Sequence, residues 1–240
     1  MARAFYADVG HMGYGESEAL QKELAEMRLS DSIPDVILFT EHTPALLFSR
    51  KITSFSHEAI SAAQAAGKHP FDHVKDAGID IHHTDFDAAT YVGPGQIAVY
   101  PVIDYTRLLK PRDAGGYQAL LDGVIMSSLE SMGVHCELKK HVTVNIDGVS
   151  HRIASKAVKM GQKVAVHGFH IHVATQATKH FGLLNIPDSF ASAEDVLGYE
   201  PAHTEVKAAV LDAIRKQMKY DNIDECAITR DERGLTVKKV

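Results

Sequence analysis

Tryptophan is absent from this chain, cysteine occurs only twice, and no apolar run approaches the length of a membrane span. A spanning helix needs about 18 consecutive apolar residues, so no membrane helix is expected. Cys136 and Cys226 lie far apart and outside any Cys-x-x-Cys spacing. This argues against a disulfide framework or a cysteine zinc site and favours a reducing compartment. The first residues also lack a signal-peptide pattern, and we therefore expect a cytoplasmic protein.

The chain also lacks the glycine-rich patterns that bind nucleotides, and it carries no excess of positive charge. Walker-type, dinucleotide-binding and nucleophile-elbow motifs are all missing, so no cofactor is expected. The formal net charge is -6, which does not indicate a nucleic-acid or anionic-membrane partner. With 240 residues, of which 45% are hydrophobic, the chain can form one large domain with a substantial core. A short C-terminal extension is expected from about residue 221.

Hydrophobic periodicity predicts a mixture of helices and strands along the chain. Helices are expected over residues 17–28, 57–66, 117–132 and 203–218. Strands are expected over residues 35–40, 78–83, 96–104, 134–139, 142–146, 153–160, 164–173, 225–229 and 235–239. Because strands and helices do not alternate strictly, the pattern favours an α+β fold with a mixed sheet covered by helices on one side.

The segment from Thr90 to Gln96 places Pro94 between Gly93 and Gly95, and an apolar strand follows it directly. Proline fixes its own φ and disfavours helix at the residue before it, while glycine tolerates close backbone approach. A rigid turn with backbone amides open to a ligand is one interpretation. A purely structural turn is the other.

Two strand segments carry groups that suit acyl chemistry. Lys156 shares one strand face with Val158 and Met160, where apolar neighbours would favour base or acyl-transfer work; a surface lysine is the alternative. His170 and His172 alternate onto one face of the next strand. They could present two imidazoles to a metal, with a third ligand from His82, His83 or His151, or they could line a pocket. Pocket-lining or surface histidines are the preferred interpretation, and no metal site is predicted.

Four blocks, in the same order along the chain, resemble those of the lipoate-biosynthesis octanoyltransferase family, within the wider group of lipoate-protein and biotin-protein ligases. Residues 41–44 resemble an early Glu-His-x-Pro block that leads to Arg50, and residues 90–96 resemble the signature Thr-Tyr-His-Gly-Pro-Gly-Gln block. Residues 156–161 resemble the block with the family's essential lysine, and residues 167–169 resemble its His-Gly-Phe block. The resemblance covers roughly residues 35 to 215.

This resemblance implies a mixed sheet with flanking helices that encloses an acyl tunnel. It also implies transfer of an octanoyl group from acyl carrier protein to a lysine of a lipoyl domain, in a 2-oxoacid dehydrogenase complex or a glycine-cleavage protein. The family uses a cysteine that takes the acyl chain as a thioester, and a lysine that favours its thiolate. Lys156 is the implied catalytic residue. The implied substrate-binding residues are Asp85, Thr90, Tyr91, Val92, Gly93, Gln96, Lys159, Met160, Gly161, His167, Gly168, Phe169 and His170.

The sequence departs from the family pattern at the nucleophile. When the chain is aligned on Phe181, the place of the cysteine falls near Pro187, and no cysteine lies there. An Arg-Gly-Gly lead into the signature block is replaced by residues 85–87, Val92 stands for the signature histidine, and residues 170–172 replace Ala-Leu-Asn. Three readings stay open: acyl transfer without the usual cysteine, ATP-dependent ligation, and a non-catalytic acyl-binding relative.

Overall fold

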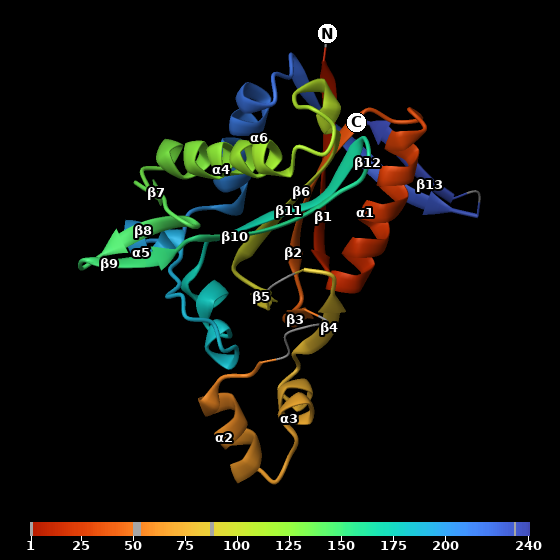
Figure 1. Ribbon diagram of the computed structural model, residues 1–240. Helices are drawn as coiled ribbons and strands as arrows, with labels where there is room; N and C mark the ends of the chain where they lie inside the picture. The colour runs from red at the N-terminus through yellow and green to blue at the C-terminus, as the bar shows by residue number, and fades with distance from the viewer. Residues whose placement is uncertain (1, 50–53, 87–88, 233) are drawn as a thin grey trace.

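The computed structural model describes residues 2–49, 54–86, 89–232 and 234–240. A sheet of seven strands, in the order β10-β11-β6-β2-β1-β12-β13, runs through its centre (Figure 1). The strands are β1 (Arg3–Met12), β2 (Asp35–His42), β6 (Gln96–Asp104), β10 (Ala154–Met160), β11 (Val164–His172), β12 (Asn222–Asp231) and β13 (Gly234–Lys239). β1 is parallel to β2 and β12, and the other neighbours are antiparallel. The sheet is therefore mixed, as the sequence predicts.

Two smaller sheets flank the main one, each of three strands in the orders β4-β3-β5 and β7-β8-β9. The first consists of β3 (Ala45–Ser49), β4 (Asp80–Thr84) and β5 (Thr90–Val92), and the second of β7 (Glu137–Leu138), β8 (Val142–Ile146) and β9 (Val149–Arg152). β5 leads directly into β6, and β9 leads directly into β10. One small sheet therefore joins the main sheet at the turn of residues 90–96, and the other joins it at the strand that carries Lys156.

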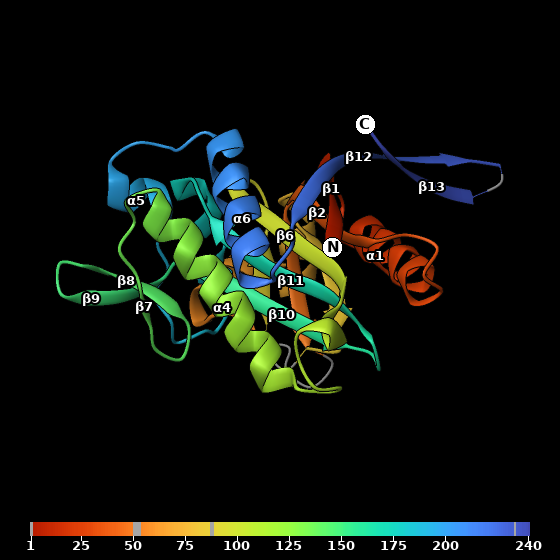
Figure 2. The same cartoon turned by 90° about the horizontal axis from the view of Figure 1, so that it is seen from above.

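Helices lie on both faces of the main sheet (Figures 1 and 2). The longer ones are α1 (Tyr14–Leu29), α4 (Ala114–Ser131) and α6 (His203–Gln217). The shorter ones are α2 (His57–Ala65), α3 (Pro70–Asp76) and α5 (Ala193–Leu197), with 3-10 turns η1 (Tyr105–Arg107), η2 (Thr175–Thr178) and η3 (Phe181–Leu183). Among the described residues no helix is long and apolar enough to cross a bilayer.

Strand β6 shows why helices must cover both faces of the main sheet. Its residues are buried almost throughout, so both of its faces need cover. Ile97 and Val99 pack into the core beneath α4 and α6, whereas Ala98, Tyr100 and Val102 pack against α1. The expectation that helices cover only one side was therefore wrong, because an apolar strand of this kind must be enclosed from both sides.

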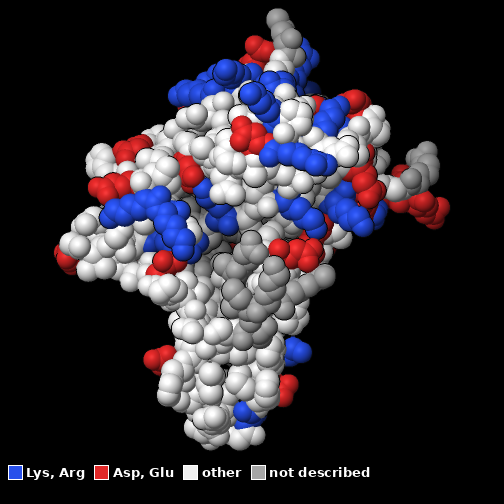
Figure 3. Space-filling view, viewed as in Figure 1, with Lys and Arg blue, Asp and Glu red and all other residues white. Residues whose placement is uncertain are grey.

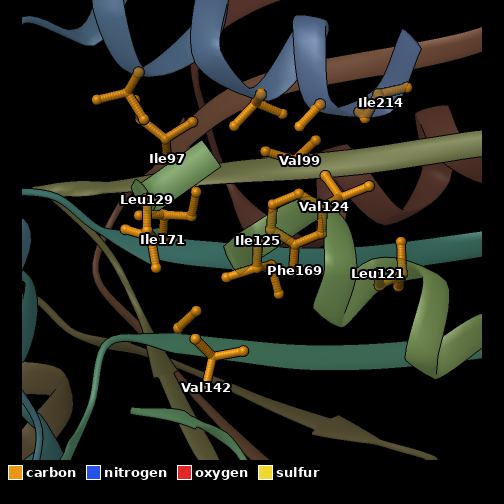
Figure 4. Close-up of a cluster of buried hydrophobic side chains, with 14 of the residues drawn as sticks. Ile97, Val99, Leu121, Val124, Ile125, Leu129, Val142, Phe169, Ile171 and Ile214 are labelled. Atoms are coloured by element: carbon orange, nitrogen blue, oxygen red, sulfur yellow. The ribbon is translucent and has the colours of Figure 1, made fainter. Parts of the chain in front are cut away.

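The larger core lies between the main sheet and the pair α4 and α6 (Figure 4). Helix α4 contributes Leu121, Val124, Ile125 and Leu129, which form one side of it. These residues belong to the apolar stripe that predicts a helix over residues 117–132. A separate small core joins α2 and α3 to the sheet of β3, β4 and β5. Together α2 and α3 project from the body and carry few charged side chains on the face in Figure 3.

Both ends of the chain contribute to the main sheet. β1 is not predicted from the sequence, because charged and small residues interrupt its apolar pattern. Its place is instead fixed by parallel pairing with β2 on one side and β12 on the other. The two strands expected near the C-terminus form β12 and β13, so the segment from about residue 221 continues the sheet.

Gly168 allows β11 to lie directly against β6. A Cβ atom at this position would lie 2.7 Å from Cδ of Pro101 and even closer to the carbonyl oxygen of Val99. The preceding residue, His167, has φ of 63°, a left-handed conformation that costs free energy for a residue with a side chain. The His-Gly step therefore brings two strands into close contact in a way that only glycine permits.

Gly168→Ala should lower the free energy of unfolding by about 1–3 kcal/mol, because the added methyl group overlaps the backbone of β6. Chemical denaturation of the variant and the wild type measures this loss. Gly182→Ala is the matched control, because a Cβ atom there meets nothing within 4 Å. Equal denaturation midpoints for Gly168→Ala and the wild type would contradict the close packing described above.

Candidate active site

A cavity of about 530 Å³ lies between the main sheet, the sheet of β3 to β5 and the segment 185–188. Strands β10 and β11 supply much of its wall, and α1 contributes Tyr14 at its first residue. The residues implied by the family resemblance that line it are Asp85, Thr90, Lys156, His167, Gly168 and His170. The consecutive segments 154–160 and 164–172 meet at this cavity because they form an antiparallel strand pair.

Lys156 lies on the edge strand β10 and forms an ion pair with a carboxylate of α4. Its Nζ lies 2.5 Å from Oδ1 of Asp122 and donates to the carbonyl oxygen of Gln118 at 3.4 Å. Val158 and Met160 pack against the larger core on the same strand face, as predicted by the two-residue alternation. The ammonium group is thus held in place, with only 16% of its side chain exposed. The sequence analysis did not identify Asp122, which is an acidic residue within an otherwise apolar helix.

His167 lines the cavity without a charge at neutral pH. Burial, helped by the charge of Lys159, lowers its pKa to about 4. Its backbone N–H donates to Oε1 of Gln21 at 2.8 Å, and its ring packs edge-on against Phe86. Gln21 therefore holds the backbone of His167, and Phe86 packs against its neutral ring.

A second buried histidine, His170, belongs to a chain of hydrogen bonds with Tyr100 and His42. The hydroxyl of Tyr100 lies 2.6 Å from Nε2 of His42 and 2.8 Å from Nε2 of His170. Since Nδ1 of His42 faces the carbonyl oxygen of Met12 at 3.0 Å, it must carry the proton, and Nε2 of His42 then accepts from Tyr100. His170 in turn donates from Nε2 to Tyr100. Burial lowers the pKa of both histidines, which favours this neutral arrangement.

Tyr14 contributes a hydroxyl group that is buried at the cavity and has no hydrogen-bond partner among the described residues. Its ring packs against those of His42 and His82, with centroids 5.8 and 5.3 Å away. A buried hydroxyl without a partner is costly, so it is a ready donor for a polar atom of a ligand.

The place expected for the family's cysteine also lies at this cavity. Asn185, Ile186, Pro187 and Asp188 all line it. Asp188 accepts from Nη1 of Arg152 at 2.9 Å and has Nε2 of His141 at 3.8 Å. A carboxylate bound to a guanidinium group therefore lies where a thiol is expected.

Neither cysteine of the chain is among the residues described as lining the cavity. Cys136 directly precedes β7 and is partly buried, and Cys226 lies within β12 at the other side of the sheet. Burial and a nearby glutamate raise the pKa of each thiol to about 11. Both thiols are therefore protonated at neutral pH and are poor nucleophiles.

Residues 13–215 match the family described as the lipoyl protein ligase A/B catalytic domain. An octanoyltransferase of Rubrobacter xylanophilus is 31% identical over 165 residues, which are 68% of this chain and 68% of that protein. The chain belongs to the lipoyl protein ligase A/B catalytic domain family. An octanoyltransferase of Syntrophobacter fumaroxidans is 25% identical over 230 residues and aligns with 92% of this chain and 93% of its own length.

The fold agrees with this family assignment. A bi-partite lipoate protein ligase of Thermoplasma acidophilum superimposes with a TM-score of 0.69 at 14% identity, over 97% of this chain and 89% of that one. The resemblance inferred from the sequence motifs, and the lipoate- and biotin-ligase-like fold class, are therefore confirmed.

The turn at residues 90–96, which resembles the signature block of the family, lies mostly behind the cavity lining. The cavity lining includes Thr90, whereas Tyr91, Val92, Gly93 and Gln96 are buried behind it. Gly93 lies so close to the ring of Tyr91 that a side chain would not fit. Gln96 donates to the carbonyl oxygens of Tyr91 and Ala177, and the N–H of Gly95 donates to Oε1 of Glu41. Of the two interpretations of this turn, the structural one describes the arrangement, because the amide of Gly95 is bonded to Glu41 and the segment 174–177 covers the turn.

The other residues implied by the family resemblance do not line the cavity; they are Lys159, Met160, Gly161 and Phe169. Lys159 pairs with Asp85 at 3.5 Å on the exposed side of β10, and Asp85 itself lines the cavity. Met160 and Phe169 pack into the larger core. Gly161 continues the ladder with Val164 and accepts from the hydroxyl of Tyr105.

No group of three or more His, Cys, Asp or Glu side chains in the described parts of the chain is arranged to hold a metal ion. His170 and His172 share one face of β11, as expected, but each ring is engaged with other protein groups. His172 faces the carbonyl oxygen of Ala191 through Nδ1 at 3.2 Å. His170 therefore lines the cavity, and His172 lies behind the lining.

Acidification from about pH 6.5 to about pH 4 should destabilise the protein. Burial lowers the pKa of His167 and His172 to about 4, so in this range the unfolded chain binds more protons than the folded one. The free energy of unfolding should therefore fall as the pH falls through this window, which denaturation at a series of pH values measures.

His167→Gln should make this pH dependence shallower by up to one proton, because one of the buried titrations is removed. His135→Gln is the matched control, since the side chain of His135 is 90% exposed. A pH dependence that is identical in His167→Gln and the wild type would show that burial of this imidazole does not act on stability.

Proposed function

We propose that this protein transfers an octanoyl or lipoyl group from acyl carrier protein to a lysine of a lipoyl domain, in the cytoplasm and without ATP. The observation that carries the proposal is the position of Lys156 at a cavity that also includes the segment 185–188. Membership of the family and the octanoyltransferases among the relatives support it. Both cysteines are free thiols, which is consistent with a reducing compartment.

The cavity has the surfaces that such a substrate needs. Apolar groups that suit an acyl chain come from several elements, namely Leu47, Phe86, Ala89, Val158 and Ile186. Polar groups that suit a thioester carbonyl lie among them, including the unpartnered hydroxyl of Tyr14. The cavity thus offers apolar surface for a chain and polar groups for a carbonyl side by side, and small-molecule sites combine the two in this way.

Lys156 supplies a positive charge at this site. Its ammonium group is fixed by Asp122, so its position is set before a substrate binds. A fixed cation stabilises the negative charge that develops on the carbonyl oxygen when a thioester is attacked. Asp122 is therefore proposed as a positioning residue, which acts through Lys156 rather than on the substrate.

The proposal is tested by incubating the protein with octanoyl-acyl carrier protein and a lipoyl domain, with and without ATP. We expect the lipoyl domain to gain one octanoyl group in both cases, as measured by intact mass. A gain only with ATP would assign ligation instead. A lipoyl domain that stays unmodified under both conditions would exclude either enzymatic activity and leave an acyl-binding role.

Lys156→Ala should lower the rate of transfer by about 100- to 1000-fold, the usual effect of removing a group that stabilises developing charge. Lys22→Ala, at an exposed position of α1, should transfer at the wild-type rate. Full activity of Lys156→Ala would remove Lys156 from the mechanism.

Loss of stability is separated from loss of chemistry by a double variant. Lys156→Ala leaves Asp122 without its cation, and an uncompensated buried charge destabilises a fold. Lys156→Met combined with Asp122→Leu removes both charges together. This double variant should regain the stability lost in Lys156→Ala, and it should remain inactive.

A further inference from the structure

The proposed reaction lacks the family's nucleophile, and a hydroxyl group lies next to Lys156 at the same cavity. Ser155 precedes Lys156 on β10 and points to the opposite face of the strand, where it pairs in register with His170. It lines the cavity and is 5% exposed, so it is sheltered but borders the space that a substrate would enter. The segment 185–188, where the cysteine is expected, lines the same cavity.

The hydroxyl of Ser155 has a histidine base within reach. Oγ of Ser155 lies 3.4 Å from Nε2 of His172, whose Nδ1 faces the carbonyl oxygen of Ala191 at 3.2 Å. A carbonyl oxygen only accepts hydrogen bonds, so Nδ1 carries the proton and the lone pair of Nε2 faces the serine. Nucleophile, base and orienting group therefore follow one another, as in activated serines generally. Hydrogen bonds of this kind are often long before a substrate binds.

A guanidinium group lies on the other side of the serine. Nη2 of Arg152 donates to Oγ of Ser155 at 3.4 Å, and Nη1 donates to Asp188 at 2.9 Å. The carboxylate fixes the guanidinium group, which in turn places a positive charge beside the hydroxyl oxygen. Such a charge favours the alkoxide and the negative charge of a tetrahedral intermediate. Asp188 thus lies in the segment where the family's cysteine is expected, and it fixes the guanidinium group that lies beside Ser155.

We propose that Ser155 is the nucleophile that accepts the acyl group in this protein, with His172 as its general base. This proposal rests on the proposed function. Oγ of Ser155 bonds to the carbonyl carbon of the donor thioester while its proton passes to Nε2 of His172. The carbon–sulfur bond then breaks, and the leaving thiolate takes that proton. The amine of the acceptor lysine next attacks the acyl-serine ester and gives up a proton to His172, and the amide forms as Oγ leaves and regains this proton.

The neighbouring groups are less suited to these two roles. Nε2 of His170 is committed to Tyr100, and the amine of Lys156 is held by Asp122. His172 is fully buried, and burial together with Arg152 lowers its pKa to about 4. It is therefore neutral at pH 7, and its geometry leaves the lone pair of Nε2 facing the serine. The same low pKa makes it a weak base, so the proton transfer depends on the negative charge of the tetrahedral intermediate, which stabilises the imidazolium while it forms.

The test uses the full chain and the octanoyl thioester of N-acetylcysteamine as the donor, without an acceptor. We expect the protein to gain one octanoyl group on the peptide that contains Ser155. The bond should resist neutral hydroxylamine and yield to alkali, as an ester does, whereas a cysteine thioester would be cleaved by neutral hydroxylamine and a lysine amide would resist both. Ser155→Ala should form no such adduct, and its transfer to a lipoyl domain should fall by at least about 100-fold.

Ser155→Cys is the second variant, because it replaces the hydroxyl with a thiol of nearly the same size. We expect it to form an adduct at the same position that neutral hydroxylamine cleaves, and to restore transfer. Ser61→Ala is the matched control, since Ser61 is exposed on α2. It should behave as the wild type does in both measurements.

The two proposals fail in different ways. Transfer at the wild-type rate by Ser155→Ala, or an adduct confined to Lys156 or a cysteine, overturns the nucleophile and leaves octanoyl transfer intact. An adduct on Ser155 without transfer to any lipoyl domain supports the nucleophile and overturns the acceptor. If no adduct accumulates in the wild type, the loss of transfer in Ser155→Ala and its return in Ser155→Cys support the proposal. Absence of both adduct and transfer in the wild type overturns both.

Discussion

The register between β10 and β11 determines which groups meet at the cavity. Ser155 pairs with His170, and Lys156 pairs with Phe169, so the two sides of the edge strand carry different chemistry. Neighbouring residues of a strand point to opposite faces, and a slip by one residue would exchange them. Lys156 would then lose Asp122, and Ser155 would turn away from His172. The close contact of Gly168 with Val99 and Pro101 fixes the position of β11 against β6, so the strand on which β10 pairs is itself held in place.

Buried histidines account for much of the polar character of this site. His42, His167, His170 and His172 are all inside the protein, and burial lowers the pKa of each. Neutral imidazoles can be buried at modest cost when their nitrogens are paired, as in the chain through Tyr100. These neutral imidazoles therefore provide fixed hydrogen-bond donors and acceptors and add no net charge. Among the charged groups that line the cavity, Lys156 and Arg152 are each bound to a carboxylate.

The sequence predicts the parts of this structure that depend on local pattern. The alternation along residues 153–160 places Lys156 with Val158 and Met160, and the structure shows this face. The partner of Lys156 could not be predicted in this way, since Asp122 reaches it only through the packing of α4 on the sheet. The turn at Gly93 was ambiguous for a similar reason. Glycine indicates that something lies close, and only the fold shows that it is the ring of Tyr91 rather than a ligand.

No cysteine lies in the segment 185–188, where the family resemblance leads us to expect one, and the groups around this segment suit a different nucleophile. A thiol serves as a nucleophile when a nearby cation favours its thiolate. Here the corresponding segment carries Asp188, which binds Arg152 and so directs the guanidinium group toward Ser155. A serine needs more than a cation, because its hydroxyl group is far less acidic than a thiol and requires a base to take the proton. His172 stands where the family pattern has another residue, and its imidazole is within reach of that hydroxyl group. Hydrogen bonds thus connect the carboxylate of Asp188, the guanidinium group of Arg152, the hydroxyl of Ser155 and the imidazole of His172. The effect of replacing any one of these groups therefore depends on the other three.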